Sequence, residues 1–302
     1  MNIMNTVTKF SKKSLELALD AKSGNSIIDY YTEAGPDYEY WSKNFNMHFG
    51  YASKKWDCLS REKMLQRMNE FVLNSLKIIP GDNVLDLGCG LAATIRFGGE
   101  RYPEVNFKGV TITPWQIKQS EYLIAQSKLN NVSVILGDYS NLPIKSNSID
   151  ATYGLESICH AEGSNKHKPL KEAYRVLRYG GRFTMVDGFL KKSEEKLSPL
   201  FKKMYRLVCD NWALPGFPNV NKVVLEMKNI GFREIEVDEI SWKIAPSAVH
   251  SPFLSLIYLI KSLFKKDKLK QQNWNNLKAC FTIFFLGLFR KTIGYYKITA
   301  IK

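Results

Sequence analysis

The pattern with the clearest chemical meaning in this 302-residue chain is an aspartate followed by two glycines. In the run VLDLGCGLAA at 84–93, Asp86 stands two residues before Gly88, and Gly90 follows after one cysteine. Glycines let a backbone turn sharply against a ligand, and the first NH groups of a following helix can bind its polar atoms. The same turn, written GxGxxA, also fits a dinucleotide. The turn alone therefore predicts a nucleotide-type cofactor without fixing its class.

The ends of the next two expected strands narrow the class of cofactor. A dinucleotide site expects a carboxylate for the ribose at the end of the second strand, whereas the sequence there reads GVTIT at 109–113. Asp86 could accept hydrogen bonds from an amino-acid ammonium. Asp138, which Tyr139 follows, could bind an adenine amino group. We therefore expect a ligand in which a nucleoside is joined to an amino acid.

Short apolar runs that alternate with helical stretches must position these residues. Such alternation is typical of βαβ crossovers in a parallel sheet, whose ligand lies beyond the carboxyl ends of the strands. The functional residues are therefore expected in the loops that follow the strands. The expected strands are 83–87, 107–112, 132–136, 149–153, 182–187, 233–241 and 294–301, and the expected helices are 60–76, 115–129 and 170–177.

Several spaced motifs between 80 and 189 together resemble the class I S-adenosylmethionine-dependent methyltransferases. The motifs are DLGCG, GDYSNLP, IDATYGLES and AYRVLRYGGRF. The resemblance implies a Rossmann-like α/β fold with a mostly parallel seven-stranded sheet, an N-terminal helical segment and a helical C-terminal insertion. It also implies S-adenosyl-L-methionine as the cofactor. The residues that the resemblance assigns to the cofactor are Asp86, Gly88, Gly90, Thr111, Gln116, Asp138 and Tyr139.

The segment GVTITPWQ narrows the resemblance to one group of these enzymes. Thr111 stands where many relatives carry an acidic residue for the ribose. The segment is similar to the GxTxSxxQ form of sterol, tocopherol and cyclopropane-forming methyltransferases. In that form, Thr111 and Gln116 would line the cofactor instead, although both could also be purely structural.

Two further stretches resemble the sterol C-24 methyltransferases and point to the chemistry. YGLESICHA at 153–161 resembles their IEATCHA-like loop, and YEYWSKNFNMHFGYA at 38–52 resembles their aromatic region. Methylation of an alkene carbon leaves a carbocation, which requires aromatic faces, a dry pocket and a nearby base. The expected catalytic residues are Glu156, His160 and, as a third candidate, His48, each with a structural role as the alternative. The expected substrate-binding residues are Tyr38, Tyr40, Trp41, Phe45 and Phe49.

The charge is unevenly distributed along the chain. Lys and Arg number 43 against 29 Asp and Glu, a net charge of +14, and the stretch 261–302 has 10 basic residues and one acidic residue. Such an excess favours a negatively charged neighbour, either nucleic acid or an anionic membrane. Two apolar blocks, 252–260 and 279–289, are each followed by cations. They are too short to cross a bilayer and are therefore either core helices or faces at a lipid interface.

The chain divides into three zones. Residues 1–80 are expected to form a helical, aromatic-rich substrate cap, residues 81–190 the cofactor-binding core, and residues 191–302 the rest of the sheet with an apolar and basic helical lid. Five scattered cysteines without a close pair argue against a disulfide framework and against a zinc site, and no metal is expected. The start of the chain lacks the apolar stretch of a secretory signal. These features favour a cytoplasmic protein, with peripheral membrane association as an open alternative and no indicated oligomeric state.

Four functions are consistent with the fold that the sequence predicts. The first is a C-methyltransferase that acts on an alkene or an electron-rich carbon of a hydrophobic isoprenoid or sterol-like lipid. The second is an N- or O-methyltransferase of a small metabolite. A nucleic-acid methyltransferase is disfavoured because the cations surround apolar blocks and no DPPY-like motif follows the fourth strand. The fourth is a membrane-surface protein that keeps the fold without catalysis.

Overall fold

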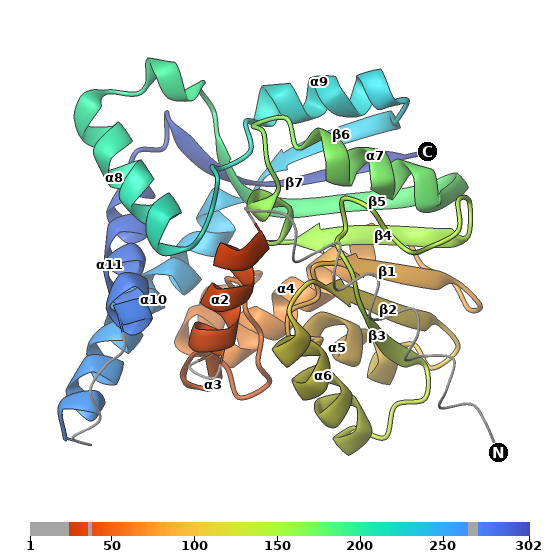
Figure 1. Cartoon of the computed structure of the whole chain (residues 1–302), viewed down its shortest axis with the longest axis horizontal. Helices are drawn as coiled ribbons and strands as arrows, with labels where there is room; N and C mark the ends of the chain where they lie inside the picture. Colours follow the sequence, from red (N-terminus) through yellow and green to blue (C-terminus); the bar gives the residue numbers. More distant parts are fainter. Residues whose placement is uncertain (1–23, 36–37, 265–270) are drawn as a thin grey trace.

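A seven-stranded sheet forms the centre of the computed structural model, which describes residues 24–35, 38–264 and 271–302 (Figure 1). The strands are β1 Asn83–Leu87, β2 Asn106–Thr111, β3 Val132–Leu136, β4 Ile149–Leu155, β5 Leu177–Leu190, β6 Arg233–Glu239 and β7 Ile293–Ile301. Their order is β3-β2-β1-β4-β5-β7-β6. Strands β1 to β5 are joined by parallel pairings, whereas β7 lies antiparallel between β5 and β6. The mostly parallel, Rossmann-like sheet predicted from the sequence is confirmed.

Helices cover both faces of the sheet and therefore bury its apolar residues. The helices are α2 Gly24–Ala34, α3 Tyr38–Trp41, α4 Arg61–Ser75, α5 Ala93–Arg101, α6 Pro114–Gln126, α7 His167–Val176, α8 Pro199–Asn211, α9 Val220–Ile230, α10 Ser241–Phe264 and α11 Gln271–Leu286.

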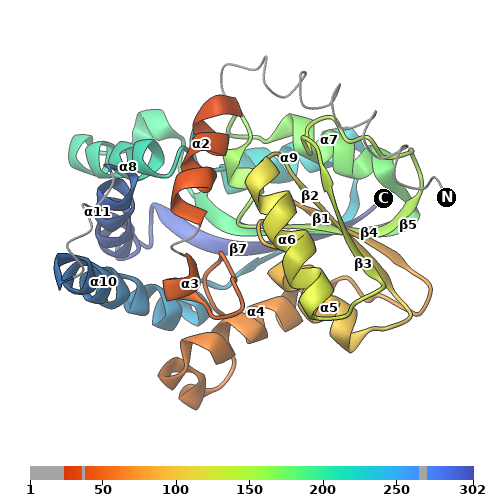
Figure 2. The same ribbon diagram turned by 60° about the horizontal axis from the view of Figure 1, so that its bottom comes forward.

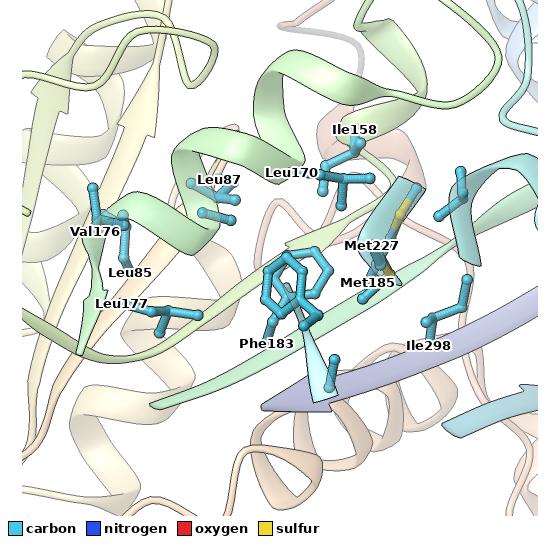
Figure 3. Close-up of a cluster of buried hydrophobic side chains, with 14 of the residues drawn as sticks. Leu85, Leu87, Ile158, Leu170, Val176, Leu177, Phe183, Met185, Met227 and Ile298 are labelled. Atoms are coloured by element: carbon cyan, nitrogen blue, oxygen red, sulfur yellow. The ribbon is translucent and has the colours of Figure 1, made fainter. Parts of the chain in front are cut away.

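One face of the sheet packs against α7 and α9. There Phe183 of β5 lies among Leu170, Val176 and Met227, all fully buried (Figure 3). The opposite face packs against α4, α5 and the start of α10, which contributes Ile244. These two cores fix the strands, so the loops at the strand ends start from rigid positions.

Helix α4 shows how the sequence specifies one of these covers. Ser60 caps its N-terminus by accepting a hydrogen bond from the backbone NH of Lys63, as serine commonly does at this position. Met64, Met68 and Val72, spaced by four residues, are fully buried against the sheet. The predicted helix 60–76 therefore matches α4 closely.

A third cluster of helices lies beyond the end of the sheet toward which β4 points. Figures 1 and 2 show α8, α10 and α11 gathered there, with α2 between them and α6. Phe201 of α8 packs edge-on against Phe289, with ring centroids 5.4 Å apart. Both apolar blocks predicted from the sequence, 252–260 and 279–289, belong to this cluster. Among the described residues, none of the helices combines the length and the hydropathy that a membrane-spanning helix needs.

Candidate active site

A cavity of about 830 Å³ lies at the carboxyl ends of the parallel strands. The glycine turn after β1 and the loop after β3 line one part of it, and α2 with the chain that follows α8 lines another. This is where ligands of doubly wound sheets bind, because the strand ends converge there. The cavity therefore joins residues that are far apart in the sequence.

The turn after β1 has room for glycine and nothing larger. Gly88 has a φ of +93°, and a Cβ added to it would meet the Cβ of Ser157 at 2.6 Å. Gly90 has a φ of +52°, and its Cβ would come within 2.9 Å of the sulfur of Met47. An L side chain is disfavoured at both positions by the backbone conformation as well as by space. A ligand can therefore approach the main chain of this turn closely.

Asp86 is buried at the end of β1 and lines the same cavity. Its Oδ2 accepts a hydrogen bond of 2.7 Å from the hydroxyl of Tyr153 in β4. Burial raises the pKa of Asp86 to about 7, although the bond from Tyr153 opposes the shift. A cationic group placed beside this carboxylate would stabilise its charged form.

The other residues assigned to the cofactor also line the cavity. The hydroxyl of Thr111 donates to Oε1 of Gln116 at 2.5 Å, so these two buried side chains form a pair. Asp138 is exposed, and its Oδ1 accepts from the backbone NH of Ser140 at 2.7 Å. The hydroxyl of Tyr139 donates to the carbonyl of Ser157 at 3.0 Å. All seven assigned residues thus surround a single space.

Glu156, directly after β4, is held in the cavity wall by two donors. Its Oε1 accepts from the backbone NH of Phe49 at 2.7 Å and from the hydroxyl of Tyr295 in β7. Its φ of +48° is unusual for a residue with a side chain and often marks a functional position. Burial raises the pKa of Glu156 to about 8, against the effect of both hydrogen bonds. A carboxyl group with this pKa can hold or release a proton near neutral pH.

His160 lies on the cavity wall in contact with Tyr31 of α2. Its Nδ1 is 3.4 Å from the carbonyl oxygen of Ala213, and its Nε2 is 2.8 Å from the hydroxyl of Tyr31. Burial lowers the pKa of His160 to about 4, so the ring is neutral at pH 7. A carbonyl oxygen can only accept, so Nδ1 carries the proton and Nε2 accepts from Tyr31. The pair joins α2 to the loop after β4.

Lys166 anchors this loop from behind. Its ammonium group donates to the carbonyls of Cys159 at 2.9 Å, Ala161 at 2.5 Å and Gly216 at 2.8 Å. The side chain is almost completely buried, and burial lowers its pKa. The NH of Cys159 also donates to buried Asp187 at 3.0 Å. Lys166 therefore fixes the segment that carries His160 against the chain that follows α8.

Comparisons with known proteins agree with this geometry. Residues 84–181 match the family model described as a methyltransferase domain. Cycloartenol-C-24-methyltransferase 1 of Oryza sativa subsp. japonica is 28% identical over 218 residues, which are 69% of this chain and 59% of the relative. The chain thus spans somewhat more than half of that relative's length. Norajmaline N-methyltransferase of Rauvolfia serpentina is 33% identical over 136 residues, 44% of this chain and 46% of the relative.

A solved structure shows the same fold over nearly the whole chain. The mycolic acid cyclopropane synthase CmaA1, complexed with SAH and CTAB, superposes with a TM-score of 0.78 and 17% identity. The match covers 91% of this chain and 97% of that structure. Residues 84–181 therefore carry a methyltransferase domain, and the chain has the fold of the superposed structure.

The residues at the glycine turn of the methyltransferase domain fit S-adenosylmethionine, the cofactor expected from the sequence. A Cβ at Gly88 would meet Ser157 and one at Gly90 would meet Met47, so both positions present bare backbone in the cavity lining. The buried carboxylate of Asp86 opens on the same cavity and suits the ammonium of an amino acid. The fit thus rests on shape at the glycines and on charge at Asp86.

The third catalytic candidate, His48, is enclosed by protein partners. Its Nδ1 is 2.8 Å from the carbonyl of Phe49, and its Nε2 is 2.9 Å from Oδ1 of Asn69. Burial lowers its pKa to about 4. His48 touches the cavity wall, but both ring nitrogens are already engaged. The structure therefore gives it a role in holding the loop that contacts Glu156.

The predicted aromatic wall is only partly present around the methyltransferase cavity. Among the side chains described, Phe45 lines the cavity, while Tyr38, Trp41 and Phe49 do not. Trp41 packs edge-on against Phe49 at 5.9 Å and donates to the carbonyl of His48. The side chain of Tyr40 lies outside the described part. Trp41 and Phe49 thus pack against each other outside the cavity lining, and contact of Tyr38, Trp41 and Phe49 with a substrate stays a prediction.

Several residues of the cavity wall were not predicted from the sequence. Aromatic content indicates the general region of Tyr31, but no local signal shows that its helix closes the cavity. Tyr295 reaches Glu156 only through the antiparallel pairing of β7 with β5. The breaker-rich stretch ALPGFP at 213–218 marks a turn, which is the available signal for the lining residues after α8. The additional lining residues are Tyr30, Tyr31, Met47, Cys209, Ala213, Leu214 and Pro215.

Proposed function

We propose that the protein transfers a methyl group from S-adenosylmethionine to an alkene or electron-rich carbon of a hydrophobic isoprenoid or sterol-like lipid. The observation that carries the proposal is the position of Glu156. It places a carboxyl group with a pKa of about 8 in the same cavity as the glycine turn and aromatic rings. Carbon methylation of an alkene needs these features together, because a cation forms and a proton must then leave.

The cofactor end of the cavity would be held by residues that already surround it. Bound S-adenosylmethionine supplies an electrophilic methyl group on a positively charged sulfur. Asp86 would bind the ammonium, Gly88 and Gly90 would admit the amino-acid portion, and Asp138 with Tyr139 would hold the adenine. Thr111 and Gln116 would line the same part of the cavity.

The acceptor end would be formed by Tyr31, Phe45, Glu156 and His160. Aromatic rings stabilise positive charge, and Tyr31 and Phe45 both line the cavity. The hydroxyl of Tyr31 donates a hydrogen bond to His160 and keeps its proton, so the lone pairs of its oxygen are available to a developing cation. Glu156 would accept the proton released from the acceptor. A cation in the cavity lowers the pKa of Glu156, so the carboxylate is available at that stage.

Similarity adds support at the level of substrate class. The rice relative is named for C-24 methylation of cycloartenol, and the superposed structure is named as a cyclopropane synthase of mycolic acid. Both names indicate a hydrophobic acceptor that is modified at carbon. A cavity of about 830 Å³ falls within the range of small-molecule sites and would hold the reacting part of such a molecule.

N-methylation of a small amine is the second candidate. It is favoured by the segment that is 33% identical to norajmaline N-methyltransferase. A buried carboxylate at Glu156 could bind an ammonium as well as accept a proton from it. The two candidates differ in whether carbon or nitrogen receives the methyl group.

A methyl-labelled donor separates them. Purified protein is incubated with labelled S-adenosylmethionine and, in turn, with cycloartenol, a monounsaturated phosphatidylglycerol and a panel of secondary amines. Mass spectrometry of the products then identifies the methylated atom. The proposal expects a new carbon–carbon bond in one of the lipids. Exclusive labelling of amine nitrogen would replace it with the second candidate.

A further inference from the structure

Helix α10 is built with its apolar side outward. Phe253 is 64% exposed, and Leu256, Ile257 and Ile260 are 47%, 48% and 45% exposed. The spacing i, i+3, i+4, i+7 places these four side chains, which we call the outer face of α10, on one side of the helix. An exposed apolar stripe of this length is informative because surface helices normally turn such residues toward the core.

The opposite side of α10 is polar and buried. Ser247, Ser251 and Ser255 recur every four residues and are at most 9% exposed. Ser247 accepts a hydrogen bond of 2.8 Å from the backbone NH of Gly50. Ser251 and Ser255 contact Cys280 of α11. The serines therefore have partners within the protein, while the apolar residues have been left outside.

Helix α11 continues the apolar surface. Trp274, Phe281 and Phe285 recur at helical spacing and are 41%, 39% and 51% exposed, and Leu288 beyond the helix is 65% exposed. Figures 1 and 2 both show α11 running beside α10 at the margin of the molecule. The two helices thus place apolar side chains on the surface of one pair.

The charge of this pair is one-sided. Residues 241–289 contain seven lysines and a single acidic residue, Asp267. Five of the lysines fall within 261–270, and Lys278 is exposed on α11. Lysine stems can lie along an apolar surface while their ammonium groups reach negative charge. An apolar stripe combined with cations is the composition of helices that lie in a membrane interface.

We propose that α10 and α11 dock on the surface of an anionic lipid bilayer. A second copy of the chain is a poorer occupant, because a symmetric contact would bring two lysine-rich segments together. Nucleic acid is also a poorer occupant. Aromatic rings such as Phe253 could stack on bases, but the exposed aliphatic side chains of Leu256, Ile257 and Ile260 on the same face have no partner in a nucleic acid. A bilayer surface satisfies both the apolar residues and the charge.

The docking helices are connected to the cavity wall. The hydroxyl of Tyr30 in α2 donates to Oδ1 of Asn276 in α11 at 2.7 Å. Tyr30 lines the cavity, as does its neighbour Tyr31. The bond between Gly50 and Ser247 likewise joins α10 to the residue after Phe49, whose NH contacts Glu156. A docked protein would therefore hold its cavity beside the membrane, the natural source of a hydrophobic acceptor.

Vesicle co-sedimentation tests the docking of the whole protein. The wild-type chain is mixed with vesicles of phosphatidylcholine alone or with 30 mol% phosphatidylserine, at 50 and 300 mM salt. The wild type is expected to bind the anionic vesicles more tightly and to lose affinity with salt. The combined substitutions Phe253→Ser and Ile257→Ser should reduce binding at least tenfold. The matched control substitutes Leu225→Ser and Val237→Ser, which are also exposed, and should bind like wild type.

Lysine substitutions test the electrostatic part. Lys243→Gln with Lys278→Gln, at exposed lysines of α10 and α11, should weaken binding to anionic vesicles about fivefold for each charge removed. Lys222→Gln with Lys228→Gln on α9 removes the same charge elsewhere and should change little. Equal binding of wild type and the Phe253/Ile257 variant would overturn the proposal. So would salt-insensitive binding, or a dimer in ultracentrifugation that the same variant abolishes.

The docking proposal is separable from the enzymatic one. S-adenosylhomocysteine affinity, measured by calorimetry without vesicles, should be the same for wild type and both docking variants. Loss of vesicle binding with retained cofactor affinity supports a surface that is independent of the cofactor end. Thermal unfolding at the wild-type temperature confirms that the exposed substitutions leave the fold intact.

Discussion

The hydroxyl of Tyr31 donates a hydrogen bond of 2.8 Å to Nε2 of His160. The direction of this bond is fixed by the carbonyl of Ala213, which faces the other ring nitrogen. The histidine is therefore neutral and occupied on both sides, and the tyrosine oxygen is the atom of the pair that can face a ligand. Tyr31 is therefore better placed to contact a ligand than His160 is to act as a base.

Replacement of Tyr31 by phenylalanine should lower kcat about tenfold and leave KM within a factor of two. The variant keeps the ring but loses the hydrogen bond to His160, worth about 1 kcal/mol, and with it the oxygen whose lone pairs are proposed to meet a cation. Steady-state kinetics with the acceptor that the labelling experiment yields measure both constants. Tyr179→Phe, at a tyrosine that is 78% exposed, is the control. An unchanged kcat for Tyr31→Phe would exclude this role.

Glu156→Gln should lower the methyl-transfer rate by at least a hundredfold, because an amide cannot accept the proton. Burial raises the pKa of Glu156 to about 8, so acid conditions keep it protonated. The wild-type rate should therefore rise with pH up to about 8, and a bound cation should move this rise to lower pH. Single-turnover rates from pH 5.5 to 9 measure the profile, and the variant should lack this rise. Glu121→Gln on the exposed side of α6 should behave like wild type.

Asp86→Asn should weaken the binding of S-adenosylhomocysteine about a hundredfold at pH 8, because a charged partner of the ammonium is lost. Burial raises the pKa of Asp86 to about 7. As pH falls below that value the carboxyl takes up a proton, so wild-type affinity should decline toward pH 5. Isothermal titration calorimetry follows both effects, with Asp238→Asn as an exposed control. A pH-independent affinity in the wild type would count against the assigned contact.

Lys166→Met should destabilise the protein by about 3 kcal/mol, because three carbonyl groups lose their shared donor. Urea unfolding measures the change in free energy. Lys171→Met on the exposed side of α7 should change stability by less than about 0.5 kcal/mol. If Lys166→Met proved as stable as this control, the ammonium group would not be the anchor of the His160 loop.

Hydrophobic patterning predicted most of the sheet because its central strands, such as β1 and β4, are buried on both faces. The expected strands 83–87 and 132–136 coincide with β1 and β3. Strand β5 starts at Leu177, five residues before the expected start, because exposed residues 178–180 carry no apolar signal. A helix was expected directly after the glycine turn, but the bounds of α5 were not predicted, since a nine-residue helix with paired Gly98 and Gly99 shows little periodicity.

The site was predictable where it depends on topology. Asp86 lies near the end of β1, whereas Asp138 and Glu156 follow β3 and β4, and such strand ends meet at one edge of the sheet. The hydrogen-bond partners of Glu156 could not be predicted from the sequence. Tyr295 and Phe49 approach Glu156 from opposite ends of the chain, and their register is set by packing that no local pattern records.

The position of Tyr295 has a consequence for biosynthesis. Strand β7 is inserted between β5 and β6, so the inner part of the sheet receives its last member near residue 301. Until that segment has left the ribosome, Glu156 lacks one of its two donors and β6 has no neighbour to pair with. The nascent chain can therefore assemble the nucleotide half early, but competence for the reaction must wait until β7 has been synthesised.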